Sequence, residues 1–470
     1  MVFLFSDGKV MGLRVPKIEK LMGIEVYATH SLGIGGVIRE FVEDFVVEEV
    51  LIDDAMAKIR QQHVEGQDFK PSINERYLLC VLVKRNWDTF EALKAVARQL
   101  NIRLRQMHIA GIKDAKAVTA QHITIEGVSP EDVKKVNVKD IEIRPVGFFR
   151  HKLSSYYLLG NSFNITVRAI QHSKSTIQRR INETIKGLEE LGGLPNFFGH
   201  QRFGTTRPIT HLVGKAIVKG DLRKAVMLFL AKPSLKENPE SRQAREQLWK
   251  SQDFQKALKN FPRQLRYERL MLRHLAKKPD DFVGAFKTLP VKLQMLFPQA
   301  YQAYLFNKFL SRRIAGGLPL NRAEVGDYVV HVQRSGLPLL TMYKIVKSET
   351  LTEVNEALRN GRMCLALPLI GFKQKLSQGF QGEVERQILE GEGITPENFK
   401  IHFMPAISSK GGLRTALTQL INFQLTDVSA DSVKPRKNKA KLSFMLPKGS
   451  YATILLRELM KSRNPAKTGF

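Results

Sequence analysis

The sequence of 470 residues contains little cysteine and no long apolar run. Its two cysteines, Cys80 and Cys364, both lie inside short apolar stretches. Two such residues can form neither a disulfide framework nor a cysteine-based zinc site, so we expect both thiols to be buried. No apolar run approaches the roughly 20 residues of a membrane-spanning helix, and Asp7 interrupts the apolar start of the chain. The sequence therefore predicts a cytoplasmic protein without a membrane partner.

Motifs that bind common cofactors are also missing. There is no GxxxxGK[ST] loop for ATP or GTP, and the glycines at 33, 35 and 36 lack the GxGxxG spacing of a dinucleotide site. Neither HExxH nor the zinc-deaminase pattern occurs, and none of the 11 histidines is spaced like one of a pair of metal ligands. We expect no cofactor and no metal.

Acidic residues are too few to balance the basic ones. The chain has 74 Lys and Arg against 45 Asp and Glu, a formal net charge of +29. A polyanionic partner explains this excess, because each phosphate contact releases condensed counterions. A thermophilic surface would mix both signs, and a membrane-surface protein would carry a long basic amphipathic helix, which we do not find. Nucleic acid is the expected partner.

The length predicts two domains, or one domain with a large insertion. Up to about residue 200, short strands such as 77–83 alternate with helices, one of which begins with the capping residues Asp88 and Glu91. Helical patterns dominate after Gly204, and strand character resumes near Arg414. We predict an α+β fold with a largely antiparallel sheet, interrupted by a mostly helical insertion.

The stretch AGIKDAKAVTAQHITI, residues 110–125, contains our candidate nucleophile, Asp114. Gly111 permits a tight turn, and the pair Lys113 and Asp114 stands between two apolar segments, where the chain should reach the surface. Taken alone, such a pair is typical of a solvated turn. The assignment therefore depends on the rest of the sequence.

A second notable segment, KPRKNKAK, lies between two strands near the end of the chain. Residues 431–470 contain ten Lys or Arg and two acids. A basic hairpin tip predicts a phosphate clamp, and on composition alone a flexible solubilising loop is the alternative. The candidate RNA-binding residues are Lys434, Arg436, Lys437, Lys439 and Lys441.

Six segments follow one another in a family's order: GGVIREFVEDFVVEE, KRNWDTFEAL, AGIKDAKAVTAQ, GNSFNITVR, LPNFFGHQRFG and FMLPKGSYATILLREL. With them the chain resembles the TruD family of tRNA pseudouridine synthases, and AGxKDxxAVTxQ with PNxFGxQRFG is highly specific. The resemblance implies a pseudouridine synthase fold with a mixed sheet, made from residues 1–204 and 412–470. A TRUD insertion domain would occupy residues 205–411, starting as early as 193.

The resemblance also implies a reaction. Uridine is detached from C1′ at N1, rotated and rejoined through C5, without cofactor or metal, usually at uridine 13 of the tRNA D arm. The protein would then be an isomerase that acts on tRNA, and no protein partner is implied. The alternative is a non-catalytic RNA-binding or RNA-chaperone protein on the same fold.

Roles of single residues follow from the same resemblance. Asp114 would attack the target nucleotide at C6 or at C1′, and Arg457 would be its ion-pair partner; alternatively, Arg457 is an exposed helix residue paired with an acid. Phe163 would stack on the flipped uracil, unless it is a core residue. Asn161, on the same strand face, could hydrogen-bond around Asp114 or the base.

Further residues are assigned more loosely to binding and positioning of the RNA. Several relatives have a lysine followed by PEDF where this chain has Arg39 and then VEDF, and a guanidinium differs from an ammonium in geometry. Arg39 keeps the positive charge of this position, and we place it among the RNA-contacting residues. The others in this set are Lys113, Gln121, His200, Gln201, Arg202 and Phe203.

Overall fold

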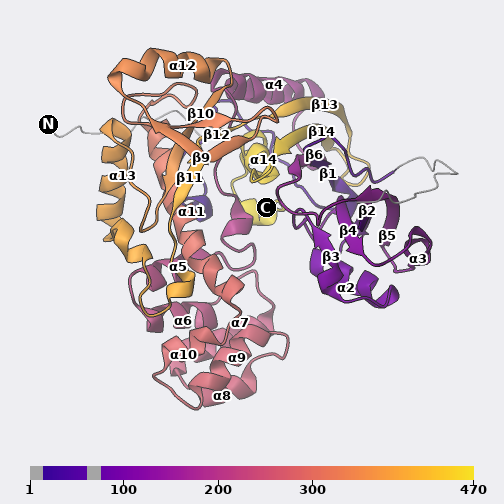
Figure 1. The fold of residues 1–470 in the computed structure, drawn as a ribbon, viewed down its shortest axis with the longest axis vertical. Helices are drawn as coiled ribbons and strands as arrows, with labels where there is room; N and C mark the ends of the chain where they lie inside the picture. The colour runs from indigo at the N-terminus through magenta and orange to yellow at the C-terminus, as the bar shows by residue number, and fades with distance from the viewer. Residues whose placement is uncertain (1–13, 61–75) are drawn as a thin grey trace. The chain divides into compact units, whose positions relative to one another are not determined.

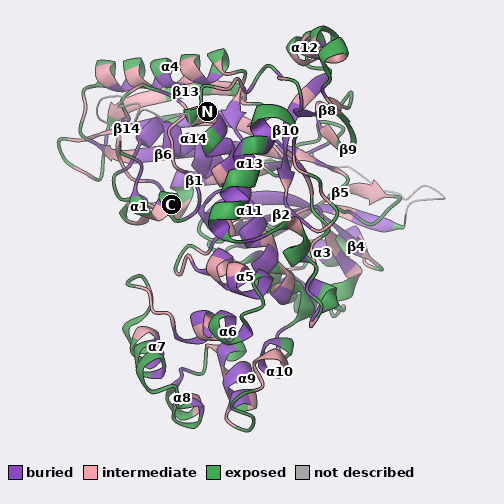
Figure 2. Ribbon diagram, turned by 90° about the vertical axis from the view of Figure 1, so that its left-hand side faces the viewer, coloured by how far each residue is buried: buried purple, intermediate pink, exposed green. Residues whose placement is uncertain are grey.

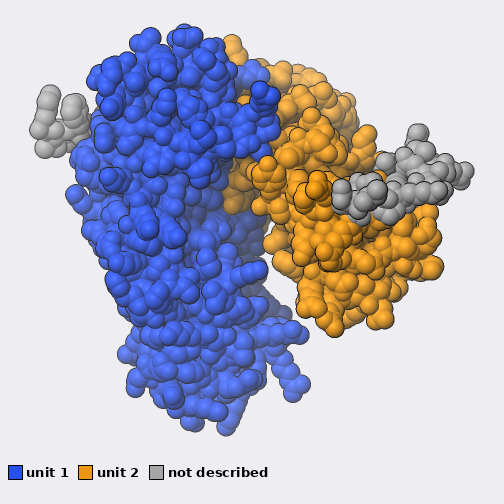
Figure 3. All heavy atoms as spheres, in the orientation of Figure 1, with its two compact units in different colours: residues 1–30, 188–417 blue, residues 31–187, 418–470 orange. Residues whose placement is uncertain are grey.

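The computed structural model describes residues 14–60 and 76–470. The chain divides into two compact units, shown in Figure 3: unit 1 comprises Met1–His30 and Leu188–Leu417, and unit 2 comprises Ser31–Gly187 and Thr418–Phe470. Residues 14–30 thus cluster with the helical part of the chain, although we expected them in the sheet domain. The reason is visible in side-chain hydrogen bonds, since Asn307 donates to the carbonyl of Met22 and Ser311 donates to that of Gly23.

Unit 2 is built on one large sheet (Figure 1). Its strand order is β13-β14-β6-β1-β4-β2-β5, with β3 paired to β4. Only the β1–β4 pairing is parallel among these pairs, so the prediction of a mixed, largely antiparallel sheet is confirmed. The elements are η1 (Val42–Asp44), β1 (Phe45–Leu51), β2 (Tyr77–Arg85), α2 (Thr89–Gln99), η2 (Leu104–Gln106), β3 (Met107–Ile109), β4 (Val118–Glu126), α3 (Pro130–Lys134), β5 (Ile141–Phe149), β6 (Leu158–Ile170), α4 (Lys174–Glu190), β13 (Ile421–Ala430), β14 (Asn438–Pro447), α14 (Ala452–Met460) and η7 (Pro465–Lys467).

Helix α2 begins at the predicted cap and packs on one face of this sheet. The side chain of Asp88 accepts hydrogen bonds from the backbone N–H groups of Phe90 and Glu91. Apolar side chains of α2, β2, β4 and β5 form one buried cluster, which includes Leu82 and Val96. Side chains alternate between the two faces along a strand, so Lys84 lies on the same face of β2 as Leu82.

A register row connects this face to the candidate site. Lys84 lies opposite Thr119 of β4, Thr119 is aligned with Val47 of β1, and Val47 lies opposite Phe163 of β6. Phe163 in turn lies opposite Phe444 of β14. The row shows how strands from both ends of the chain place their side chains on one face.

Unit 1 is mostly helical and carries a four-stranded antiparallel sheet of order β11-β10-β8-β9. Its elements are α1 (Lys17–Lys20), β7 (Leu194–Pro195), η3 (His200–Arg202), α5 (Thr210–Val218), α6 (Leu222–Ala231), α7 (Pro239–Ser251), α8 (Phe254–Asn260), α9 (Arg266–Leu275), α10 (Phe282–Lys287), α11 (Val291–Ala315), β8 (Tyr328–Val332), β9 (Pro338–Ile345), η4 (Ser348–Thr350), α12 (Leu351–Arg359), β10 (Met363–Leu369), α13 (Gly379–Glu392), η5 (Pro396–Phe399), η6 (Pro405–Ile407) and β11 (Gly412–Thr415), and β12 (Leu417–Thr418) follows at the junction with unit 2.

The long helix α11 is the buried centre of unit 1, as Figure 2 shows by its purple colour. It contacts α5 so closely that a Cβ on Gly214 would lie 2.0 Å from the carbonyl oxygen of Phe297. Glycine at position 214 therefore permits the two helices to pack directly on each other.

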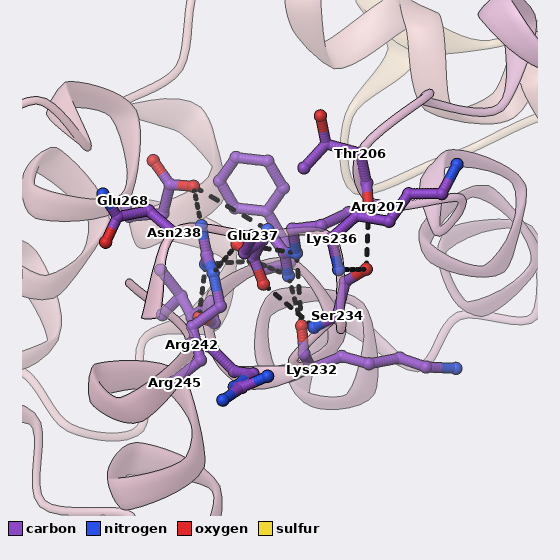
Figure 4. A network of polar contacts seen from close by, with 12 residues as sticks. Thr206, Arg207, Lys232, Ser234, Lys236, Glu237, Asn238, Arg242, Arg245 and Glu268 are labelled. Atoms are coloured by element: carbon purple, nitrogen blue, oxygen red, sulfur yellow. Dashed lines mark hydrogen bonds and ion pairs between the residues drawn. The ribbon is translucent and has the colours of Figure 1, made fainter. Parts of the chain in front are cut away.

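Two arginines fix the segment that follows the QRFG motif in unit 1 (Figure 4). Arg207 and Arg245 both donate to carbonyl oxygens at the end of α6, among them that of Phe229. Glu237 and Glu268 accept from Arg245 at 2.7 Å each. Burial and the charge of Arg245 lower the pKa of Arg207 to about 10. Cations at a helix C-terminus stabilise the helix, so this network joins α6 to the polypeptide before it.

Among the helices of residues 14–60 and 76–470, none is long and apolar enough to cross a bilayer. The same residues contain no cluster of three His, Cys, Asp or Glu side chains that could hold a metal ion. Cys80 is buried as predicted, and burial raises the pKa of its thiol, whereas Cys364 is only partly buried.

Candidate functional site

The candidate nucleophile, Asp114, lies on the loop between β3 and β4, and its side chain is 34% exposed. Buried groups hold the backbone on both sides of it. Lys84 Nζ donates to the main-chain oxygen of Asp114 at 2.6 Å and to that of Trp87 at 2.8 Å. The hydroxyl of Thr89 accepts from the N–H of Lys113 and donates to its carbonyl. The loop therefore presents one accessible carboxylate on a firmly anchored backbone.

Arg39 is the cation at this carboxylate. Its Nη2 donates to Asp114 Oδ1 at 3.2 Å, and its Nη1 donates to the main-chain oxygen of Gly469 at 3.0 Å. The guanidinium carbon also lies 4.0 Å from the ring centroid of Phe45. Burial lowers the pKa of Arg39, while the charge of Asp114 acts in the opposite direction. An arginine is always protonated at neutral pH, so this pair keeps a permanent positive charge beside the carboxylate.

Arg457, the expected ion-pair partner, has another environment. It lies on α14, whose residues are all buried, and its Nη1 contacts Glu458 Oε1 at 2.6 Å. Its side chain is 1% exposed, so the alternative of an exposed helix residue does not fit either. Within the described part of the chain, Asp114 has Arg39 rather than Arg457 as its ion-pair partner. A buried guanidinium needs a nearby anion, and the adjacent glutamate of α14 supplies it.

Lys113 points into the sheet, although we expected it to contact RNA. Its Nζ lies 2.5 Å from Glu49 Oε2, and Glu49 also accepts from the N–H of His122 at 3.0 Å. Burial alone would raise the pKa of Glu49, but the hydrogen bonds and charges of His122 and Lys113 outweigh it and lower that pKa. The charge of Lys113 is thus neutralised inside the protein. The ion pair with Glu49 anchors the Asp114 loop to β1.

Lys84 is the residue of this site that the sequence analysis missed. It is fully buried, and burial lowers its pKa to about 8, with Asp114 and Asp88 acting in the opposite direction. One signal was available, because a lysine that directly follows the apolar run 77–83 must either leave the sheet or find acceptors inside it. The main-chain oxygens of Trp87 and Asp114 are those acceptors.

Phe163 is a buried residue of β6 with 6% exposure. Its ring stacks on Phe444 with centroids 5.3 Å apart and meets Phe45 edge-on at 6.3 Å. Since Arg39 lies over Phe45, a continuous row leads from Asp114 through Arg39 and Phe45 to Phe163. Stacking of Phe163 on a base stays a prediction, and its environment here is that of a core residue.

Two amide side chains lie near this row. Asn161, two residues before Phe163 on β6, is half-buried, and its Oδ1 has no hydrogen-bond partner among the described residues. Gln121 is fully buried and donates to the carbonyl of Gly111 at 3.2 Å, so it holds the start of the Asp114 loop. The side-chain oxygens of both amides, Asn161 Oδ1 and Gln121 Oε1, are buried without a hydrogen-bond partner among the described residues.

The residues of the PNFFGHQRFG segment belong to unit 1, whereas Asp114 belongs to unit 2. His200 is buried, Gln201 is exposed, and Arg202 donates to Gln299 at 3.3 Å. Phe203 is buried and contacts the ring of His211. Their roles toward the RNA stay predictions.

The basic segment between β13 and β14 is anchored rather than isolated. Asp431 accepts from the backbone N–H of Ala169 and pairs with Arg168 at 3.1 Å. Lys434 pairs with Glu40 at 2.6 Å. Arg436 and Lys441 are exposed, and Lys437 and Lys439 are partly buried. Two of the five predicted phosphate-binding residues, Arg436 and Lys441, are thus exposed.

Comparisons with known proteins identify relatives over nearly the whole chain. The family model described as tRNA pseudouridine synthase D (TruD) matches residues 21–459. A probable tRNA pseudouridine synthase D from Methanosarcina mazei is 39% identical, over 96% of this chain and 98% of the relative. That from Methanosarcina acetivorans is 40% identical with the same coverage. The crystal structure of a putative TruD from Methanosarcina mazei superposes with a TM-score of 0.81 at 39% identity, over 96% of this chain and 99% of that one. The chain therefore belongs to the TruD family of tRNA pseudouridine synthases.

Proposed function

We propose that this protein is a tRNA pseudouridine synthase, an isomerase that converts uridine 13 of the D arm into pseudouridine with Asp114 as the nucleophile. One observation carries the proposal: a partly exposed carboxylate stands on a backbone anchored from both sides and pairs with Arg39, whose side chain is 11% exposed. Family membership supports the reaction class, and the names of the relatives support tRNA as substrate.

The reaction needs only what these side chains offer. A carboxylate can attack without a base to activate it, and Arg39 keeps it charged when the site closes around the nucleotide. Attack of the Asp114 carboxylate at C1′ or C6 forms an O–C bond, and the N1–C1′ bond breaks. The uracil then rotates, C5 bonds to C1′, and the bond between Asp114 and the nucleotide breaks, which releases the carboxylate. The C5 proton leaves and N1 takes up a proton. The nucleotide is isomerised without gain or loss of atoms.

The target base must leave its stack, at a cost of a few kcal/mol. Asn161 supports base recognition, because its buried Oδ1 has no hydrogen-bond partner among the described residues and could accept from the edge of an extruded uracil. Phe163 would stack on the base once its neighbours move. The phosphate backbone would be bound by the exposed hairpin residues Arg436 and Lys441, by the partly buried Lys437 and Lys439, and by Gln201 and Arg202 of the QRFG segment.

The decisive experiment is a single-turnover assay of Asp114→Asn on unmodified tRNA. We expect no pseudouridine from this variant, while its tRNA affinity stays within a small factor of the wild-type value. Turnover by Asp114→Asn would refute the mechanism. Binding without turnover by the wild-type protein would favour the alternative, a non-catalytic RNA-binding or RNA-chaperone protein. A tRNA with cytidine at position 13 tests the site, since residual pseudouridine in it would place the target elsewhere.

A further inference from the structure

We propose that the segment 465–470 positions Arg39 and, through it, the carboxylate of Asp114. This inference rests on the proposed function. The segment lies outside residues 21–459, to which the family model extends. It nevertheless provides one of the contacts of the Arg39 guanidinium, because the main-chain oxygen of Gly469 accepts from Arg39 Nη1 at 3.0 Å.

The segment is held in shape by its own hydrogen bonds. The N–H groups of Thr468 and Phe470 both donate to the carbonyl of Pro465, at 3.1 Å each. The hydroxyl of Thr468 donates to Ser462 at 2.9 Å, and the Phe470 side chain is buried. This turn leaves the carbonyls of residues 468 and 469 free to accept from neighbouring chain.

Those two carbonyls bind two successive residues. The N–H of Ile38 donates to the oxygen of Thr468 at 3.0 Å, and the side chain of Arg39 donates to that of Gly469. The contact is close, because a Cβ on Gly469 would lie 2.1 Å from the main-chain oxygen of Ile38, and Gly469 has a φ of +95°. Only glycine fits at position 469 without displacing either this segment or the backbone at Ile38.

Arg39 itself has a φ of +58°, a left-handed conformation that is unfavourable for an arginine. Such a conformation persists where surrounding contacts determine it, and the pairing of residue 38 with residue 468 is one of them. The guanidinium is planar, so fixing Nη1 on Gly469 also fixes the direction of Nη2, which donates to Asp114. The segment thus orients the Arg39 guanidinium toward the carboxylate of Asp114.

Gly469→Ala tests this inference. A displaced carbonyl weakens a hydrogen bond to a charged group, so we expect kcat for pseudouridine formation to fall at least about tenfold. KM and tRNA affinity should change by less than about twofold, because the residue does not contact the base. The matched control is Gly361→Ala, which also has a positive φ of +67°, but with no described atom within 4 Å of its Cβ position. Gly361→Ala should keep the wild-type kcat.

A double-mutant cycle with Arg39→Ala shows whether the segment acts through the arginine. In the Arg39→Ala background, Gly469→Ala should have no further effect on kcat, whereas fully additive losses would overturn the inference. Phe470→Ala is a second test if Gly469→Ala does not fold. It removes the buried side chain at the end of the segment, so it should lower kcat in the same way. Wild-type kcat in both variants, with Asp114→Asn inactive, would refute this inference and leave the proposed function standing. Turnover by Asp114→Asn would refute the proposed function itself.

Discussion

The ammonium of Lys84 lies 2.6 Å from the main-chain oxygen of Asp114, so a fully buried cation holds the backbone of the candidate nucleophile. It is a positioning contact, because the donor reaches the peptide group and leaves the carboxylate to Arg39. The second acceptor of Lys84, the carbonyl of Trp87, joins the loop to the end of β2. Loop, sheet and nucleophile are thereby fixed to one another.

Lys84→Met should lower kcat by about tenfold or more with little change in KM, because it frees the loop without touching the RNA. Lys84→Arg is the conservative comparison, and it should retain less than wild-type activity, since a guanidinium does not fit the space of an ammonium. Single-turnover rates at saturating enzyme measure both. A Lys84→Met variant with wild-type kcat would show that Thr89 and Glu49 are sufficient to hold the loop.

The stability contributed by Lys84 should depend on pH in a defined direction. Its pKa in the folded protein is about 8, below the ordinary value of 10.5, so between these pH values the unfolded chain binds more protons. The contribution of Lys84 is therefore present above pH 10.5 and is lost as the pH falls through 8. Urea unfolding of wild type and Lys84→Met at pH 7.5, 9 and 10.5 should show their difference growing with pH, by about 3 kcal/mol at most. A difference that is constant across this range would contradict a buried, partly neutral amine.

Arg39 and Arg457 should respond differently to substitution, although both are arginines of the same unit. Arg39→Ala should lower kcat about 30-fold, corresponding to about 2 kcal/mol for a hydrogen bond between charged groups, at nearly unchanged stability. Arg457→Met should instead lower the free energy of unfolding by about 3 kcal/mol, because it removes one member of a buried ion pair. The folded fraction of Arg457→Met should keep its kcat. Chemical denaturation and single-turnover rates separate the two, and the opposite pattern would restore Arg457 as the partner of Asp114.

The comparison of these arginines also shows what the sequence could predict. Alternating apolar residues and the cap at Asp88 were sufficient for the fold class, and the loop of Asp114 was found between two apolar segments. The ion-pair partner of Asp114 was not predicted, because it depends on tertiary contacts. The side chain of Arg39 is oriented by its left-handed backbone and by the hydrogen bond to Gly469, far along the chain. Lys113 was misjudged for the same reason, because its partner Glu49 lies on another strand. Local pattern identifies a site, whereas long-range pairing decides which charges face the ligand.

The buried pair of Lys113 and Glu49 should behave as a structural unit beneath the nucleophile. Glu49→Gln or Lys113→Met alone should destabilise the fold by about 3–5 kcal/mol, because each leaves a buried charge without its partner. The double variant should lose less than the sum of the two, which thermal or urea unfolding can measure. Additive losses would show that the two side chains do not depend on each other.

The basic hairpin offers a graded test of RNA binding. Arg436 and Lys441 are exposed, whereas Lys434 is already paired with Glu40. Arg436→Ala and Lys441→Ala should each weaken tRNA binding and reduce the slope of log K against log salt by about 1, because each removes one phosphate contact. Lys434→Ala is the matched control with a smaller effect, since its charge is neutralised within the protein. Binding titrations between 50 and 200 mM salt measure the slopes. Equal effects of all three substitutions would indicate only a general loss of positive charge, and no effect of any would place the RNA on another surface.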